Sequence, residues 1–109
     1  DLGHYERMLG INLAQDSSIS SGQIFQEVLD GERKGRYLGK CIQLVPHASD
    51  MVKRRLLEFA LHHEVEFVLV EIGGTVGDME GELFLEAVRQ LRMELSGQVM
   101  LAHLSYVPH

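Results

Sequence analysis

The stretch that decides the expected fold is Phe67–Glu80, which reads FVLVEIGGTVGDME. Its apolar run ends at a single carboxylate, Glu71. The turn that follows carries three glycines, Gly73, Gly74 and Gly77. In open α/β folds, ligands bind beyond the carboxyl ends of the strands, where a carboxylate can hold Mg²⁺ beside a phosphate. The stretch therefore predicts a buried strand that delivers Glu71 to a metal and nucleotide site.

The regions on either side of this stretch carry alternating signals for helices and strands. Apolar residues recur with helical spacing over 22–30, 49–63 and 78–96, and Ser20 with Gln23 forms a possible capping box before the first helix. Short apolar runs predict strands over 41–45, 66–71 and 99–107. The order β-α-β-α-β predicts an α/β fold in which right-handed crossovers join parallel strands.

Composition and charge exclude several classes of protein. The chain has 109 residues and a net charge of −6, which argues against nucleic-acid binding because phosphate contacts need clustered Lys and Arg. No apolar run reaches the ~18 residues of a membrane span, and no signal peptide is recognisable. Cys41 is the only cysteine, so no internal disulfide can form, which suits a cytoplasmic protein. Because Cys41 opens an apolar run, we expect a buried structural thiol.

Motifs that bind phosphate or supply a nucleophile are missing from the sequence. There is no G-x-x-x-x-G-K-[ST] loop to hold phosphates and no G-x-S-x-G or G-x-C-x-G nucleophile turn. The chain also begins at Asp1 without an initiator Met, and three strands would make a thin sheet. We therefore expect a fragment of a longer protein, with no catalytic side chain of its own.

Six segments together resemble the synthetase (amidoligase) domain of CTP synthases, in the same order and with little or no gap. They read DLGHYER (1–7), SSGQIFQEVLDGERKGRYLG (20–39), IQLVPH (42–47), VEIGGTVGDME (70–80), FLEAVRQ (84–90) and HLSYVP (103–108). The resemblance implies a three-layer, P-loop-NTPase-like parallel sheet. This sheet would be partial, because the strand and helix of the phosphate loop are missing. Residues 1–109 would then be an internal fragment of the amidoligase domain, without the glutaminase domain.

The resemblance also implies a reaction and its partners. In this family ATP activates UTP, and ammonia released from glutamine in the glutaminase domain converts it to CTP. Mg²⁺ is the implied cofactor, CTP is a feedback inhibitor, GTP is an activator, and the intact enzyme is a homotetramer. The family's phosphate loop and UTP-gripping lysines have no counterpart in this sequence, so we expect the 109-residue chain alone to be inactive.

Site residues are carried over position by position from the same resemblance. Asp1 and Glu71 match the Mg²⁺-binding carboxylates, and Asp1 also matches an ATP-binding residue. The positions matched to CTP or UTP binding are His4, His47, Asp78, Met79 and Glu80. The positions matched to a lid-like loop that couples to the glutaminase half and to GTP are Arg33, Arg36, Tyr37, Leu38 and Gly39.

Simpler interpretations remain open for several of these residues. Asp78 is also a good helix N-cap, and Glu80 is favourable in the first turn of a helix without any ligand. His62 and His63, near the end of a predicted helix, are expected to face solvent. The whole chain could instead belong to another P-loop-type Mg-ATP ligase, such as a dethiobiotin synthetase relative. It could also be a diverged regulatory or assembly module that has lost its chemistry.

Overall fold

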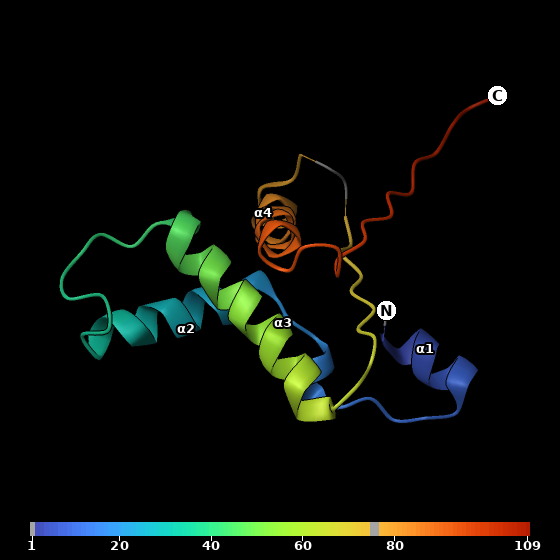
Figure 1. Ribbon diagram of the computed structural model, residues 1–109, viewed down its shortest axis with the longest axis horizontal. Coiled ribbons are helices and arrows are strands. Elements are labelled where there is room, and N and C mark those ends of the chain that lie inside the picture. The colour runs from blue at the N-terminus through green and yellow to red at the C-terminus, as the bar shows by residue number, and fades with distance from the viewer. Residues whose placement is uncertain (1, 75–76) are drawn as a thin grey trace.

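The structure is a computed structural model that describes residues 2–74 and 77–109 (Figure 1). Its α-helices are α1 (Leu2–Leu9), α2 (Ser21–Arg33), α3 (Ser49–His63) and α4 (Met79–Glu94). Two short turns complete the regular structure, η1 (Gln15–Ser17) and η2 (Leu44–Ala48). No helix in the described ranges combines the length and the apolar character that crossing a bilayer requires.

The start of α2 is fixed by the capping box that the sequence predicts. The Ser20 hydroxyl accepts a hydrogen bond from the Gln23 backbone N–H at 3.2 Å. In return, the Ser20 backbone N–H donates to the Gln23 side-chain oxygen at 3.2 Å. Each bond satisfies an N–H group that has no partner inside the helix. The prediction of this helix start is confirmed.

The core lies where α3 packs between α2 and α4 (Figure 1). Its buried apolar residues are Ile24 and Val28 from α2, Ala48, Met51 and Val52 around the start of α3, and Leu83 and Ala87 from α4. These residues recur every three or four positions, so each helix presents one apolar stripe to its neighbour. Complete burial of an Ile or Val side chain contributes about 1.5–3 kcal/mol.

The expectation of a parallel sheet is wrong. Within residues 2–74 and 77–109 the structure contains no strand, so it does not have the three-layer, P-loop-NTPase-like architecture. The segments expected as strands are largely irregular, and many of their apolar side chains reach solvent: Phe67 is 85% exposed, Leu69 98% and Leu104 97%. Cys41, expected to be buried, is exposed as well.

The helix packing gives the physical reason for this difference. An apolar run shows that a segment would gain from being covered, but a strand also needs a neighbour that completes its hydrogen-bond ladder. In a doubly covered parallel sheet, helices lie on both faces of the strands. Here the apolar stripes of α2 and α4 pack against α3 instead of against a sheet. The helices therefore cover one another, and none of the three predicted strands pairs with another in the described part of the chain.

Candidate functional site

Of the two residues predicted to bind Mg²⁺, the structure describes Glu71. Asp1 lies outside the described residues. Glu71 is exposed, and its Oε1 lies 3.9 Å from the point that a Cβ atom on Gly73 would occupy. Gly74 and Gly77 have φ angles of 95° and 102°, in the left-handed region that favours glycine. The Glu71 carboxylate thus lies against the start of the glycine turn. Its oxygen atoms are of the kind that Mg²⁺ prefers, so the residue fits that metal chemically.

The acidic residues after the glycine turn lie at the start of α4. Asp78 is the N-cap residue, with φ −73° and ψ 133°, and its side chain makes no capping hydrogen bond to the described residues. Its backbone carbonyl accepts from the Glu82 N–H at 3.0 Å. Met79 and Glu80 are exposed in the first turn, near the positive end of the helix dipole. All three side chains are therefore accessible to a ligand from solvent.

His47 has a defined position and a defined tautomer. Its Nδ1 accepts a hydrogen bond from the Gln43 backbone N–H at 2.9 Å, so the proton of the neutral ring lies on Nε2. The ring is half-buried and lies 4.8 Å from the ring of Tyr37, measured between centroids. A predicted nucleotide residue and a predicted lid residue are therefore in contact.

The predicted lid loop is shaped by left-handed backbone positions. Gly35, Leu38 and Gly39 have φ angles of 74°, 53° and 75°. Leu38 is exposed, and Arg33 is exposed with one nitrogen 3.9 Å from the Asp30 carboxylate. Arg36 instead lies beside α2 and lines a cavity that the loop forms with α3.

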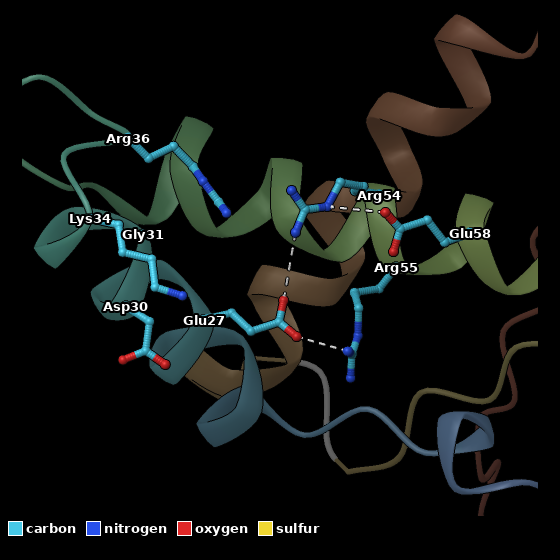
Figure 2. Close-up of a pocket in the computed structure, with 8 residues that line it drawn as sticks. All are labelled: Glu27, Asp30, Gly31, Lys34, Arg36, Arg54, Arg55 and Glu58. Atoms are coloured by element: carbon cyan, nitrogen blue, oxygen red, sulfur yellow. Dashed lines mark hydrogen bonds and ion pairs between the residues drawn. The ribbon is translucent and has the colours of Figure 1, made fainter.

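This charged cavity has a volume of about 220 Å³ and is drawn in Figure 2. Its lining residues are Glu27, Asp30, Gly31, Lys34, Arg36, Arg54, Arg55 and Glu58. Glu27 lies between two cations, 2.8 Å from Nη1 of Arg55 and 3.9 Å from Nη2 of Arg54. Arg54 also contacts Glu58 at 3.4 Å. Lys34 and Arg36 add two further cations and Asp30 a third carboxylate, so the lining is of mixed charge.

Comparison with known proteins identifies the family. The family described as CTP synthase N-terminus matches residues 1–109. The chain belongs to the CTP synthase family. It is 55% identical to the CTP synthase of Pyrobaculum calidifontis over 99% of its length, and 50% identical to that of Helicobacter pylori over 100%. The CTP synthase of Onion yellows phytoplasma is 47% identical over 100% of the chain. The chain spans 20% of the length of each of these relatives.

Among the residues that the structure describes, the predicted site residues of this CTP synthase segment do not form one cluster. Tyr37 and His47 are in contact, and Asp78, Met79 and Glu80 share the start of α4. His4 is exposed on α1, which lies to one side of the α2–α3–α4 pack (Figure 1). The structure therefore places the described site residues in separate groups: the lid loop with His47, Glu71 with the glycine turn, the start of α4, and α1.

Sequence reasoning missed the role of α3 in this CTP synthase segment. Glu27, Arg54 and Arg55 build the wall of the charged cavity, yet none was among the predicted site residues. The available signal was the basic run Lys53-Arg54-Arg55 in an otherwise amphipathic helix. Because successive residues of a helix point in different directions, the run alone does not show which of the three cations meets Glu27.

Proposed function

We propose that this chain belongs to the N-terminal region of a CTP synthase and serves, in the complete enzyme, the ATP-dependent amination of UTP to CTP. The observation that carries the proposal is the family match over all of residues 1–109, with relatives about half identical along the whole chain. The motifs that carry the resemblance most specifically are DLGHYER at the start of the chain and EIGGTVGD-x-E around Glu71. The alternative ligase, a dethiobiotin synthetase relative, is not expected to carry DLGHYER.

In this proposal Asp1 and Glu71 hold the Mg²⁺ ion. The exposed carboxylate of Glu71, beside the glycine turn, supplies oxygen ligands of the type this cation prefers. When bound, Mg²⁺ neutralises charge that develops as a phosphoryl group moves from ATP to UTP. Glu71 itself orients the ion, and the turn formed by Gly73, Gly74 and Gly77 lets backbone N–H groups approach a phosphate closely.

The remaining predicted residues have regulatory and binding roles in the proposal. His4, His47, Asp78, Met79 and Glu80 contact UTP or the inhibitor CTP. Arg33, Arg36, Tyr37, Leu38 and Gly39 form the loop that couples to the glutaminase domain and to GTP. The ring contact between Tyr37 and His47 supports a link between the two sets. The complete enzyme works in the cytoplasm as a homotetramer, and the isolated 109-residue chain makes no CTP.

The test replaces the matching segment of the Pyrobaculum calidifontis CTP synthase by residues 1–109 of this chain. The chimera should form CTP from UTP, ATP and ammonia. Glu71→Gln should lower its kcat by more than about 10²-fold, because a misplaced Mg²⁺ loses stabilisation made mainly in the transition state. Glu66→Gln is the matched control, since Glu66 is an exposed carboxylate on the same segment with no assigned role.

Two results would contradict the proposal. A chimera that assembles to the size of the natural enzyme but makes no CTP would favour the assembly-module interpretation. Near-normal kcat in Glu71→Gln would leave Glu71 as a solvated carboxylate. Size-exclusion chromatography of each variant separates lost chemistry from lost assembly.

A further inference from the structure

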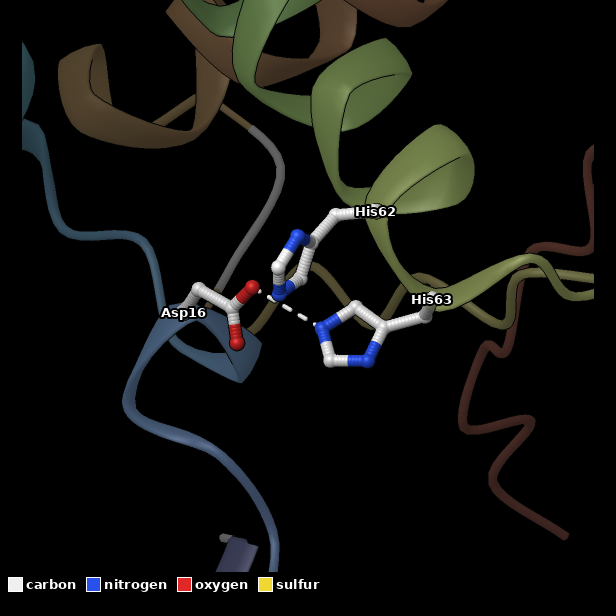
Figure 3. A group of neighbouring side chains, drawn as sticks. All are labelled: Asp16, His62 and His63. Carbon is white, nitrogen blue, oxygen red and sulfur yellow. Dashed lines mark hydrogen bonds and ion pairs between the residues drawn. The ribbon is translucent and has the colours of Figure 1, made fainter.

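Three side chains with metal-binding atoms meet at the C-terminal end of α3. His62 and His63 are the last two residues of that helix, and Asp16 comes from η1, far away in the sequence (Figure 3). Nε2 of His63 lies 2.9 Å from Oδ2 of Asp16. One ligand atom from each of the three residues lies within 4.8 Å of the other two. The fold thus brings the carboxylate of Asp16 to two consecutive histidines from a distant part of the sequence.

The distances suit a small metal ion after a modest adjustment. With metal–ligand bonds of about 2.0–2.1 Å, the ligand atoms of a tetrahedral site lie roughly 3.4 Å apart. Separations of up to 4.8 Å must therefore shorten by at most roughly 1.4 Å. The 2.9 Å contact between His63 and Asp16 must lengthen by roughly 0.5 Å. Asp16 and His62 are exposed, whereas His63 is half-buried. The more restricted His63 ring therefore defines the position toward which the other two side chains move.

Neighbouring groups hold the His63 ring and leave room for an ion. The ring lies 4.3 Å from the ring of Phe59 and 5.0 Å from that of His62, between centroids. Asp16 and His62 also line a cavity of about 290 Å³, together with Arg55, Glu58 and Phe59. Arg55, which also lines this cavity, is paired with Glu27 at 2.8 Å, and Glu58 adds a negative charge. The charged side chains around the three ligand residues therefore do not repel a bound cation strongly.

We propose that Asp16, His62 and His63 form a binding site for one divalent transition-metal ion, with Zn²⁺ as the preferred ion. Two imidazole nitrogens and a carboxylate oxygen are a donor set for Zn²⁺, Co²⁺ or Ni²⁺, whereas Mg²⁺ takes oxygen ligands. Water completes the coordination from the open side. The site is distinct from the Mg²⁺ site proposed at Asp1 and Glu71, and it fastens the segment around η1 to the end of α3.

The experiment titrates the 109-residue chain with Zn²⁺ by isothermal calorimetry and with Co²⁺ by visible absorption. The expected result is one ion per chain, with Co²⁺ bands of a tetrahedral N/O site and a melting temperature that rises with Zn²⁺ concentration. Asp16→Asn and His63→Gln should each weaken Zn²⁺ binding by about tenfold or more, because each removes one of three protein ligands. The double variant His62→Gln, His63→Gln should abolish binding.

His103→Gln is the matched control, because His103 is an exposed histidine outside the site. It should bind Zn²⁺ as the unchanged chain does. Circular dichroism of each variant without metal shows whether the helices form, and all variants at exposed positions should retain them. Absence of Zn²⁺ binding by the unchanged chain would overturn the proposal. Equal Zn²⁺ affinity in the unchanged chain, Asp16→Asn and the double histidine variant would overturn it as well.

Discussion

The imidazole of His47 lies against the phenol ring of Tyr37, with 4.8 Å between centroids and 56° between ring planes. The contact joins the loop after α2 to η2, directly before α3. Because Nδ1 of His47 is already bonded to the Gln43 N–H, the ring cannot turn without breaking that bond. A displacement of the loop would therefore change the contact that Tyr37 makes with the His47 ring. This makes the pair a physical connection between the lid residues and the nucleotide residues of the proposed function.

Tyr37→Ala should destabilise the chain by more than about 1 kcal/mol. The change removes an aromatic pair, worth about 0.5–1.5 kcal/mol, and a ring that packs against the core. Tyr37→Phe keeps the ring and is the matched control, with a free energy of unfolding close to that of the unchanged chain. Urea denaturation followed by circular dichroism measures both. A stability for Tyr37→Ala equal to that of Tyr37→Phe would show that the ring contact contributes nothing.

Ile24→Ala should cost about 2–5 kcal/mol, because it removes a fully buried side chain and leaves a cavity between α2 and α3. Ile11→Ala removes the same atoms from a side chain that is 48% exposed and should cost much less. Thermal melting of both variants compares the loss of stability at the two positions. Similar losses at the two positions would mean that the packing of α2 against α3 is not the stabilising core.

Glu86 should make stability depend on pH in a defined range. Hydrogen bonds from Arg89, and then from Gln90, lower the pKa of Glu86 from 4.5 to about 2. A lowered pKa in the folded state means that the contribution is present above about pH 4.5 and is lost as the pH falls toward 2. Glu86→Gln should remove this part of the pH dependence. An NMR titration of the Glu86 carboxyl group is the direct measurement, and a midpoint near 4.5 would contradict the ion pair.

Glu80→Lys, placed in the chimeric CTP synthase, should weaken CTP inhibition more than it raises the KM for UTP. Losing a charged hydrogen-bond partner costs roughly 1.5–3 kcal/mol, or about ten- to a hundredfold in the inhibition constant. Glu82→Lys is the matched control, because Glu82 is also an exposed acid in the first turn of α4. Both lysines oppose the helix dipole, so both should lower the melting temperature slightly.

The outcome for CTP inhibition separates the two roles of Glu80. An inhibition constant that is unchanged in both variants would leave Glu80 as a residue that only favours the start of α4. A change in Glu80→Lys alone would place the carboxylate in contact with the inhibitor.

Local features of the fold could be predicted from the sequence, whereas long-range features could not. The capping box at Ser20 follows from spacing within one helix and was predicted correctly. Of the apolar face expected at Ile24, Phe25, Val28 and Leu29, Ile24 and Val28 are buried, whereas Phe25 and Leu29 are 39% and 45% exposed. The segment 66–71 was wrongly expected to be a buried strand, because apolar character does not specify which segment pairs with it.

The same limit applies to the sites. His62 and His63 were expected simply to face solvent, and His62 is indeed exposed. Their approach to Asp16 depends on how the chain before α2 runs back past the end of α3, which no local pattern encodes. The pairing of Glu27 with Arg55 likewise depends on the angle at which α2 crosses α3.

The exposed segment before the glycine turn has a consequence for proteolysis. Phe67 and Leu69, at 85% and 98% exposure, offer a cleavage point to chymotrypsin-like enzymes between α3 and α4. A cut there separates Ile24, Val28 and Val52 from Leu83 and Ala87, so neither piece retains a complete core. The two pieces should therefore remain associated after the backbone is broken. Peptides 1–67 and 68–109, synthesised separately, should reassemble into a two-part protein.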